Sequence, residues 1–113
     1  MAHLTGQNIT TLQGNTENIS VVLDLTETPS MDIETCTFDW AVYKQTSKEI
    51  VLRKTTSSGI VADNTTGEII ITIDRGETRE LLGHYLHLCK MVDIDNNEFT
   101  PFTGTFDVEE SPI

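Results

Sequence analysis

The chain has 113 residues, with 18 acidic and 7 basic side chains that give a formal net charge of -11 at pH 7. That length suffices for one domain with one modest core. The negative charge disfavours nucleic acid and anionic membranes as partners, because both would repel the protein before short-range contacts formed. A hydrophobic content of 37% excludes a fully disordered chain and a membrane-embedded one.

The charge is unevenly distributed along the chain. Residues 1–43 carry six acids and no base, residues 44–90 carry six acids and seven bases, and residues 91–113 carry six acids and no base. Both ends are therefore electronegative, and a protein partner with basic surfaces fits this distribution. The first residues lack the basic and apolar regions of a signal peptide, so we expect a protein made and kept in a cytoplasm.

The N-terminal segment differs from the rest of the chain. Residues 1–17 are polar, with Leu4, Ile9 and Leu12 as apolar anchors. This composition predicts an extended or flexible N-terminal arm over residues 1–17, followed by a β-sandwich domain over residues 18–113.

Short runs of alternating apolar and polar residues follow the arm. They predict strands over residues 19–25, 36–43, 49–54, 60–62, 68–73, 85–92 and 99–108. Pro29 ends the first strand, and Pro101 restricts part of the last strand to an edge or a bulge. In the second strand Phe38, Trp40 and Val42 share a face, so we expect them in the core.

One segment has helical character. Asp74 can cap a short helix over residues 75–82, with Glu77 in the position of a capping-box acid and Gly83 as the stop. Strands at intervals of about 8 to 12 residues with one short helical crossover predict an all-β protein, a single antiparallel sandwich. The predicted core consists of Val21, Leu23, Phe38, Trp40, Val42, Leu52, Ile69, Ile71, Ile73, Leu82, Tyr85 and Phe106.

Two segments contain residue types that bind metals. Residues 93–98 offer alternating oxygen ligands, but they lack the central Gly and the final Glu of a calcium loop, and a solvated turn is the favoured interpretation. His84, His87 and Cys89 are zinc-ligand types. In an extended strand residues 84 and 87 point to opposite faces, so His87 and Cys89 alone share a side, two ligands short of a structural site. We therefore predict no metal.

Catalytic and redox motifs give no positive prediction either. Trp40 lies on the same strand as Cys36, whereas the immunoglobulin pattern places its Trp on the strand after the first Cys. Cys36 and Cys89 are therefore interpreted as small hydrophobic residues, and a disulfide between them is not expected. The sequence contains no G-x-S-x-G, P-loop, G-x-G-x-x-G or H-E-x-x-H motif, which predicts a protein without catalytic residues or cofactors.

The order of short signals over about the last 90 residues is more specific. It includes the run from Asp32 to Val42, a short helix followed by Leu81-Leu82-Gly83-His84-Tyr85, and a closing Gly104-Thr105-Phe106-Asp107-Val108 strand. In these features the chain resembles the small immunoglobulin-like virion proteins of tailed bacteriophages, and it is similar to the N-terminal module of baseplate upper proteins.

This resemblance implies an immunoglobulin-like sandwich of about seven strands, with one short helix and the extended N-terminal arm. It also implies a non-enzymatic structural component of a virion, placed on the head, neck, tail or baseplate. The partners would be other virion proteins, the protein would be oligomeric in the assembled particle, and it would reside in the host cytoplasm before assembly. The alternative is a carbohydrate- or cell-surface-binding β-sandwich module.

Overall fold

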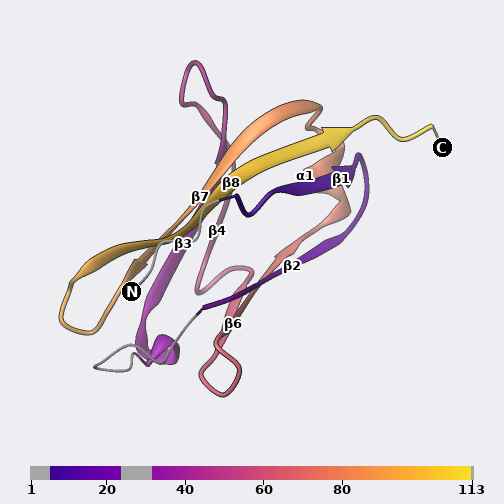
Figure 1. Cartoon of the computed structure of the whole chain (residues 1–113). Coiled ribbons are helices and arrows are strands. Elements are labelled where there is room, and N and C mark those ends of the chain that lie inside the picture. Colours follow the sequence, from indigo (N-terminus) through magenta and orange to yellow (C-terminus); the bar gives the residue numbers. More distant parts are fainter. Residues whose placement is uncertain (1–5, 24–31, 113) are drawn as a thin grey trace.

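The protein folds as two β-sheets packed face to face (Figure 1). The computed structural model describes residues 6–23 and 32–112. The five-stranded sheet has the order β1-β8-β7-β3-β4, formed by Ile9–Leu12, Glu98–Glu109, Gly83–Val92, Thr37–Tyr43 and Ile50–Thr55. The three-stranded sheet has the order β2-β6-β5, formed by Glu17–Val22, Glu68–Ile73 and Ile60–Asp63. The predicted all-β sandwich is confirmed.

The connectivity is that of an immunoglobulin-like sandwich. Strands β8, β7, β3 and β4 correspond to the G, F, C and C′ strands of a variable-type domain, and β2, β6 and β5 to strands B, E and D. The strand pairs are antiparallel except for β1 and β8, which run parallel. The structure has eight strands where the sequence predicts about seven, because residues 9–12 of the predicted arm form β1.

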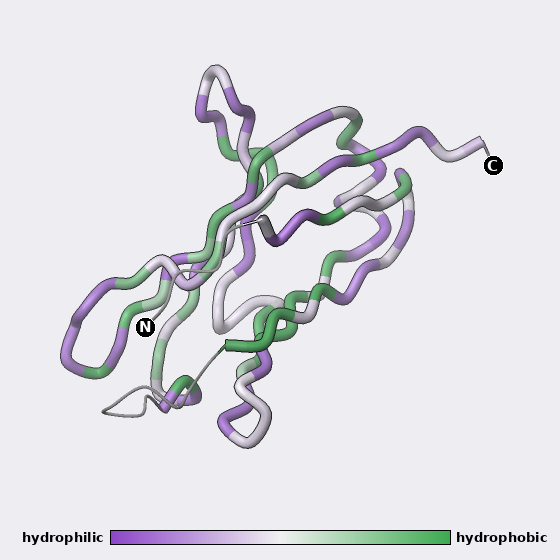
Figure 2. The backbone as a smooth tube through the Cα atoms, in the orientation of Figure 1, coloured by the Kyte–Doolittle hydropathy of each residue, from purple (hydrophilic) through white to green (hydrophobic). Residues whose placement is uncertain are grey.

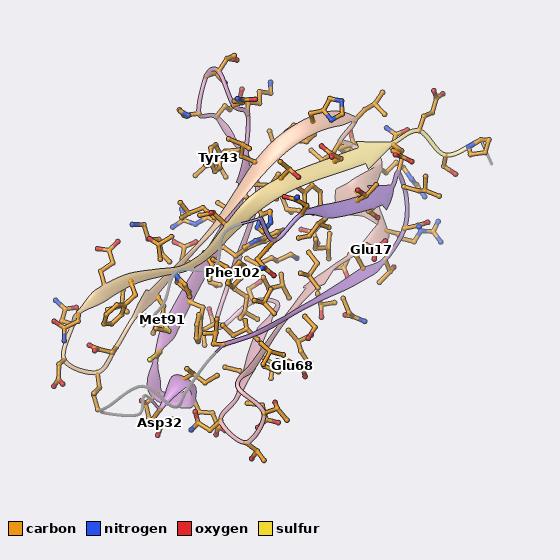
Figure 3. The ribbon with its side chains drawn as sticks, viewed as in Figure 1. Glu17, Asp32, Tyr43, Glu68, Met91 and Phe102 are labelled. Atoms are coloured by element: carbon orange, nitrogen blue, oxygen red, sulfur yellow. The ribbon has the colours of Figure 1, made fainter. Side chains whose placement is uncertain are left out.

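The core lies between the sheets. Figure 2 shows apolar segments along the facing strands and polar segments in the connecting loops. Phe102, which is 0% exposed, lies in the interior between the sheets (Figure 3). The buried apolar residues are Ile19, Val21, Leu23, Ile33, Cys36, Phe38, Trp40, Val42, Leu52, Ile60, Ile69, Ile71, Ile73, Leu81, Cys89, Met91, Phe102, Phe106 and Val108.

Ten of the twelve predicted core residues are buried, and the other two show where the prediction fails. Leu82 is 54% exposed, and its neighbour Leu81 is buried instead. Tyr85 is half-buried against the core, and its hydroxyl donates a hydrogen bond to the Leu82 carbonyl at 3.0 Å. A tyrosine at this corner that bonds the backbone a few residues upstream is a feature of immunoglobulin sandwiches.

The misplacement of Leu82 follows from the length of the helix. Helix α1 covers Arg75–Arg79 and ends three residues before the predicted residue 82, so Leu81 and Leu82 lie between α1 and β7. Its start is as predicted: Asp74 is the N-cap, and Glu77 Oε1 accepts a hydrogen bond from the Asp74 backbone N–H at 3.0 Å. Glu77 also forms an ion pair with Lys54 Nζ at 2.6 Å, which fastens α1 to β4.

Pro101 interrupts the regular pairing of the last strand, as the sequence predicts. Pro101 lies in β8 where the register with β7 shifts between Cys89 and Met91, which is the predicted irregularity. A 3-10 turn, η1 (Ile33–Thr35), precedes β3. Leu25 and Pro29, predicted to finish the first strand, lie outside the described residues. Neither helical segment in the described ranges is long and apolar enough to cross a membrane.

Candidate interaction surfaces and the His87 network

The edges of the two sheets carry exposed apolar side chains. A two-sheet sandwich has four edge strands, here β1, β4, β2 and β5. Each of them exposes one large apolar residue: Leu12 at 37%, Ile50 at 52%, Val22 at 59% and Val61 at 65%. Edge strands also present unpaired backbone N–H and C=O groups, so these edges combine both elements of a strand-pairing surface.

The interior strands differ from the edges. Within the described ranges, the other two exposed large apolar residues are Leu82, before β7 begins to pair, and Ile94, at the tip of the β7–β8 hairpin. Strands β3 and β6 carry none. The exposed apolar side chains are thus concentrated where another strand could pair.

The N-terminal segment is docked along β8 by backbone and side-chain hydrogen bonds. Strand β1 pairs with residues 106–109 of β8 in parallel register. Before it, the Gln7 N–H donates to the Thr103 carbonyl at 3.1 Å, and Asn8 Oδ1 accepts from the Thr105 N–H at 3.2 Å. The described part of the predicted arm therefore lies on the sandwich and completes one of its edges.

A buried histidine joins this segment to the core. His87, on β7, is 0% exposed. Its Nδ1 lies 3.1 Å from Trp40 Nε1, and its Nε2 lies 2.5 Å from the Gln7 carbonyl oxygen. The indole N–H is only a donor, so Nδ1 is the acceptor and the ring proton sits on Nε2, where it donates to Gln7. Both contacts are satisfied by one neutral tautomer.

Burial holds His87 in this neutral form. The pKa of His87 is lowered from its ordinary value of 6.5, because desolvation disfavours the imidazolium and outweighs the favourable hydrogen bond to Gln7. Aromatic rings surround the imidazole, with the Trp40 centroid at 5.9 Å and the Phe102 centroid at 6.0 Å. In immunoglobulin domains the second cysteine follows the corner tyrosine by two residues, so His87 occupies that position after Tyr85.

Gly104 makes room for this arrangement. It faces His87 across the β7–β8 ladder. A Cβ at residue 104 would overlap the Gln7 carbonyl group and lie 2.8 Å from His87 Nε2. The close approach of the N-terminal segment to β7 and β8 therefore requires glycine at this position.

The zinc-type residues are separated as their strand positions predict. His87 and Cys89 point into the core, whereas His84 points outward, and its Nδ1 lies 2.8 Å from Asp107 Oδ1. The residues of the incomplete calcium loop form a turn in which Asp93 Oδ1 accepts from the Asp95 and Asn97 N–H groups. No group of three or more potential ligands gathers among the residues the structure describes.

The two cysteines are buried in separate parts of the core. Cys89 is 0% exposed and Cys36 is 3% exposed, and both are free thiols. Burial raises the pKa of Cys89 to about 12, with a smaller contribution from Asp39. Desolvation also raises the pKa of Cys36. A protonated, enclosed thiol is a poor nucleophile and a poor metal ligand, which fits the interpretation of both residues as small hydrophobic side chains.

The pocket beside the ends of β3 and β4 presents no aromatic ring face to solvent. A pocket of about 630 Å³ is formed beside the ends of β3 and β4 by Thr37, Phe38, Asp39, Thr55, Thr56, Ser57, Lys90, Val92 and Glu98. Its one aromatic residue, Phe38, is itself 3% exposed. Trp40 is fully enclosed. A ring that stacks on a sugar must present its face to solvent, and neither of these rings does.

Comparisons with known proteins add no family. A scan against protein-family models matched none, and a search of curated proteins found no match.

The strand pattern placed His87 on the same side as Cys89 but did not predict its partners. Gln7 and His87 are 80 positions apart, and the parallel pairing of β1 with β8 joins residues such as Ile9 and Phe106, so strand periodicity carries no signal for either contact. The available signal was Gly104 in a strand interior, since such a glycine often marks a close backbone approach.

Proposed function

We propose that the protein is a non-enzymatic structural component of a tailed bacteriophage virion, which acts by binding other virion proteins through the edges of its sandwich. The proposal rests on the resemblance of the sequence to small immunoglobulin-like virion proteins. The single structural observation that supports it is the exposed apolar residue on each of the four edge strands.

The chemistry of the edges indicates what they bind. Strand addition takes its affinity from backbone hydrogen bonds and its specificity from alternate side chains. An apolar residue beside the free edge adds a small buried apolar contact to the paired strands. Repetition of a weak contact around a symmetric particle increases the overall affinity. The acidic surface favours neighbours with basic patches and keeps the free subunit soluble before assembly.

Mass spectrometry of purified particles tests the placement in a virion. We expect peptides of this chain in particles that remain after nuclease treatment, density-gradient purification and a salt wash. Their amount should keep a fixed ratio to the major capsid protein across gradient fractions. Absence from the particles, or a ratio that varies from fraction to fraction, would contradict the proposal.

Edge-strand variants test the binding mode. Val61→Lys and Ile50→Lys place a charge at the centre of an expected contact, and both sites are exposed, so the isolated protein should stay folded. We expect strongly reduced incorporation for at least one of them. Ile94→Lys is the matched control, because Ile94 is 79% exposed but lies on a hairpin tip. Equal incorporation of all three variants would rule out binding through these edges.

A further inference from the structure

We propose that His87 is a pH-sensitive latch, which holds the N-terminal segment on β8 while its ring is neutral and releases it when the ring is protonated. The proposal concerns the arm of the isolated protein, and it stands whether or not the protein belongs to a virion.

Two hydrogen bonds hold the His87 ring in its neutral form. The Trp40 indole donates to His87 Nδ1, and His87 Nε2–H donates to the Gln7 carbonyl. Protonation of Nδ1 would place a second N–H against the Trp40 N–H, so the contact at 3.1 Å would turn from attraction to repulsion. A doubly protonated ring therefore cannot keep the geometry that the core imposes.

A protonated His87 ring would have no carboxylate beside it to balance its charge. On β7 the same-face neighbours of His87 are Tyr85 and Cys89, and β3 contributes Trp40 and Val42. From β8 come Phe102 and Gly104, and the facing strands β2 and β6 present isoleucine and valine inward, with the half-buried Glu17 at the start of β2. Tyr43 lines the pocket beside the ring. The Glu17 carboxylate accepts from Thr11 Oγ1 of β1 at 2.6 Å and not from His87, so a buried imidazolium would lack a charge partner.

The N-terminal segment separates the His87 ring from solvent. His87 forms part of a surface pocket of about 390 Å³, whose other walls include Gly6 and Asn8 of the N-terminal segment and Thr103 and Thr105 of β8. The segment thus lies over the imidazole. Its departure opens the Nε2 side of the ring to solvent, where the charged form is hydrated. The segment can leave without unfolding the two sheets, because β1 is a four-residue edge strand.

The direction of the pH effect follows from the two states. With the segment docked, the pKa of His87 lies below 6.5, and with it released the ring is hydrated and returns toward that value. The released state binds the proton more tightly, so acid favours release. The latch is complete above about pH 6.5 and weakens as the pH falls below it, until the docked form itself titrates.

Hydrogen exchange of the intact protein is the direct test. After correction for intrinsic exchange rates, we expect the protection of amides in residues 9–12 to fall about tenfold between about pH 7.5 and about pH 5.5. Amides of the interior strand β6 should keep their protection over the same interval. Protection of β1 that does not change with pH would overturn the proposal.

Two variants separate His87 from the other titrating groups. His87→Gln keeps a donor and an acceptor but cannot titrate, and we expect it to abolish the pH dependence. His84→Gln is the matched control: His84 lies on the same strand, its side chain is 90% exposed, and its loss should leave the pH dependence intact. An unchanged pH dependence in His87→Gln would assign the effect to other groups and overturn the proposal.

A measurement on the unaltered protein covers the case in which His87→Gln fails to fold. Nitrogen-15 spectra of the imidazole should show protonated Nε2 and unprotonated Nδ1 at neutral pH. The Trp40 indole N–H signal should shift together with the loss of β1 protection as acid is added. The opposite tautomer, or an indole signal that does not follow the protection, would contradict the latch.

Discussion

Trp40 and His87 occupy the centre of the sandwich, where many immunoglobulin domains have a tryptophan packed on a disulfide. Here His87 takes the position of the second cysteine, and a hydrogen bond of 3.1 Å joins it to Trp40 on the neighbouring strand of the same sheet. A buried hydrogen bond of this kind contributes little net stability while it is intact, but it is costly to break by removal of one partner. The pair therefore makes the core sensitive to substitutions that keep its shape but remove a polar atom.

Trp40→Phe removes the indole donor and should destabilise the protein by about 2 kcal/mol, because it leaves His87 Nδ1 without a donor and a small cavity beside it. The donor to Nδ1 favours the neutral ring, so the pKa of His87 should rise toward 6.5. Urea denaturation and a histidine titration by NMR measure the two effects.

Phe106→Leu is the matched control for this substitution. The Phe106 ring packs edge-on against Trp40 at a centroid distance of 5.9 Å and has no polar atom. We expect Phe106→Leu to lower stability but leave the pKa of His87 unchanged. If Trp40→Phe also left that pKa unchanged, the hydrogen bond would not control the protonation of His87.

The thiols give a second prediction at this scale. Since the thiolate is the reactive form, and burial raises the pKa of Cys89 to about 12, alkylation of the folded protein at about pH 8 should be slow at both cysteines. In denaturant both should react quickly. Rapid labelling of the folded protein would show that the core opens more readily than its packing indicates.

At the level of secondary structure, most strands could be predicted from the sequence because apolar and polar residues alternate within each of them. In β3 every second residue from Phe38 to Val42 is buried, as the pattern predicts. The predicted helix end was three residues too late, because the end of a short helix depends on tertiary contacts. Leu81 and Leu82 are chemically identical, and only the turn after Arg79 decides which one is buried.

The candidate site was less predictable than the strands. Which strands lie at an edge depends on the order of strands in each sheet, and that order joins segments distant in the sequence. The alternation of residues within one strand does not indicate which strands lie beside it. The docking of β1 on β8 depends on the same kind of long-range pairing. Strand parity placed His87 on the same side as Cys89, but it could not predict the hydrogen bond to Gln7.

Gly104→Ala tests the docking of β1. The added methyl group would overlap the Gln7 carbonyl, so we expect the N-terminal segment to shift, with a loss of about 1–3 kcal/mol and lower protection of β1 at all pH values. Gly76→Ala is the matched control: residue 76 is in α1 with no atom within 4 Å of a new Cβ, and alanine should stabilise the helix there by about 0.5 kcal/mol. A neutral Gly104→Ala would contradict the close approach.

At the scale of the whole molecule, the charge of -11 is divided between two wholly acidic end segments and a balanced middle. In the structure parts of the two end segments lie side by side, because β1 pairs with residues 106–109 of β8. Strand β1 has no charged side chain, and the acids along this pairing are Asp107 and Glu109 of β8. These acids favour a basic neighbour at this edge.

This arrangement predicts that attachment to the particle weakens as salt is raised. Screening shortens the range of exposed charge interactions from about 10 Å at 0.1 M to about 3 Å at 1 M ionic strength. Release of the protein from particles, measured by sedimentation over a salt series, should increase steadily. Attachment that is insensitive to salt would leave the charge as a solubility feature alone.

A reconstruction of the assembled particle by electron cryo-microscopy would show directly whether the protein binds its neighbours through its sheet edges. We predict density for the eight-stranded sandwich at symmetric positions on the virion, with at least one of the edge strands β1, β2, β4 or β5 paired with or packed against a neighbouring protein. Particles without this density, or with the sandwich held only by its hairpin tips, would contradict the proposed binding through sheet edges.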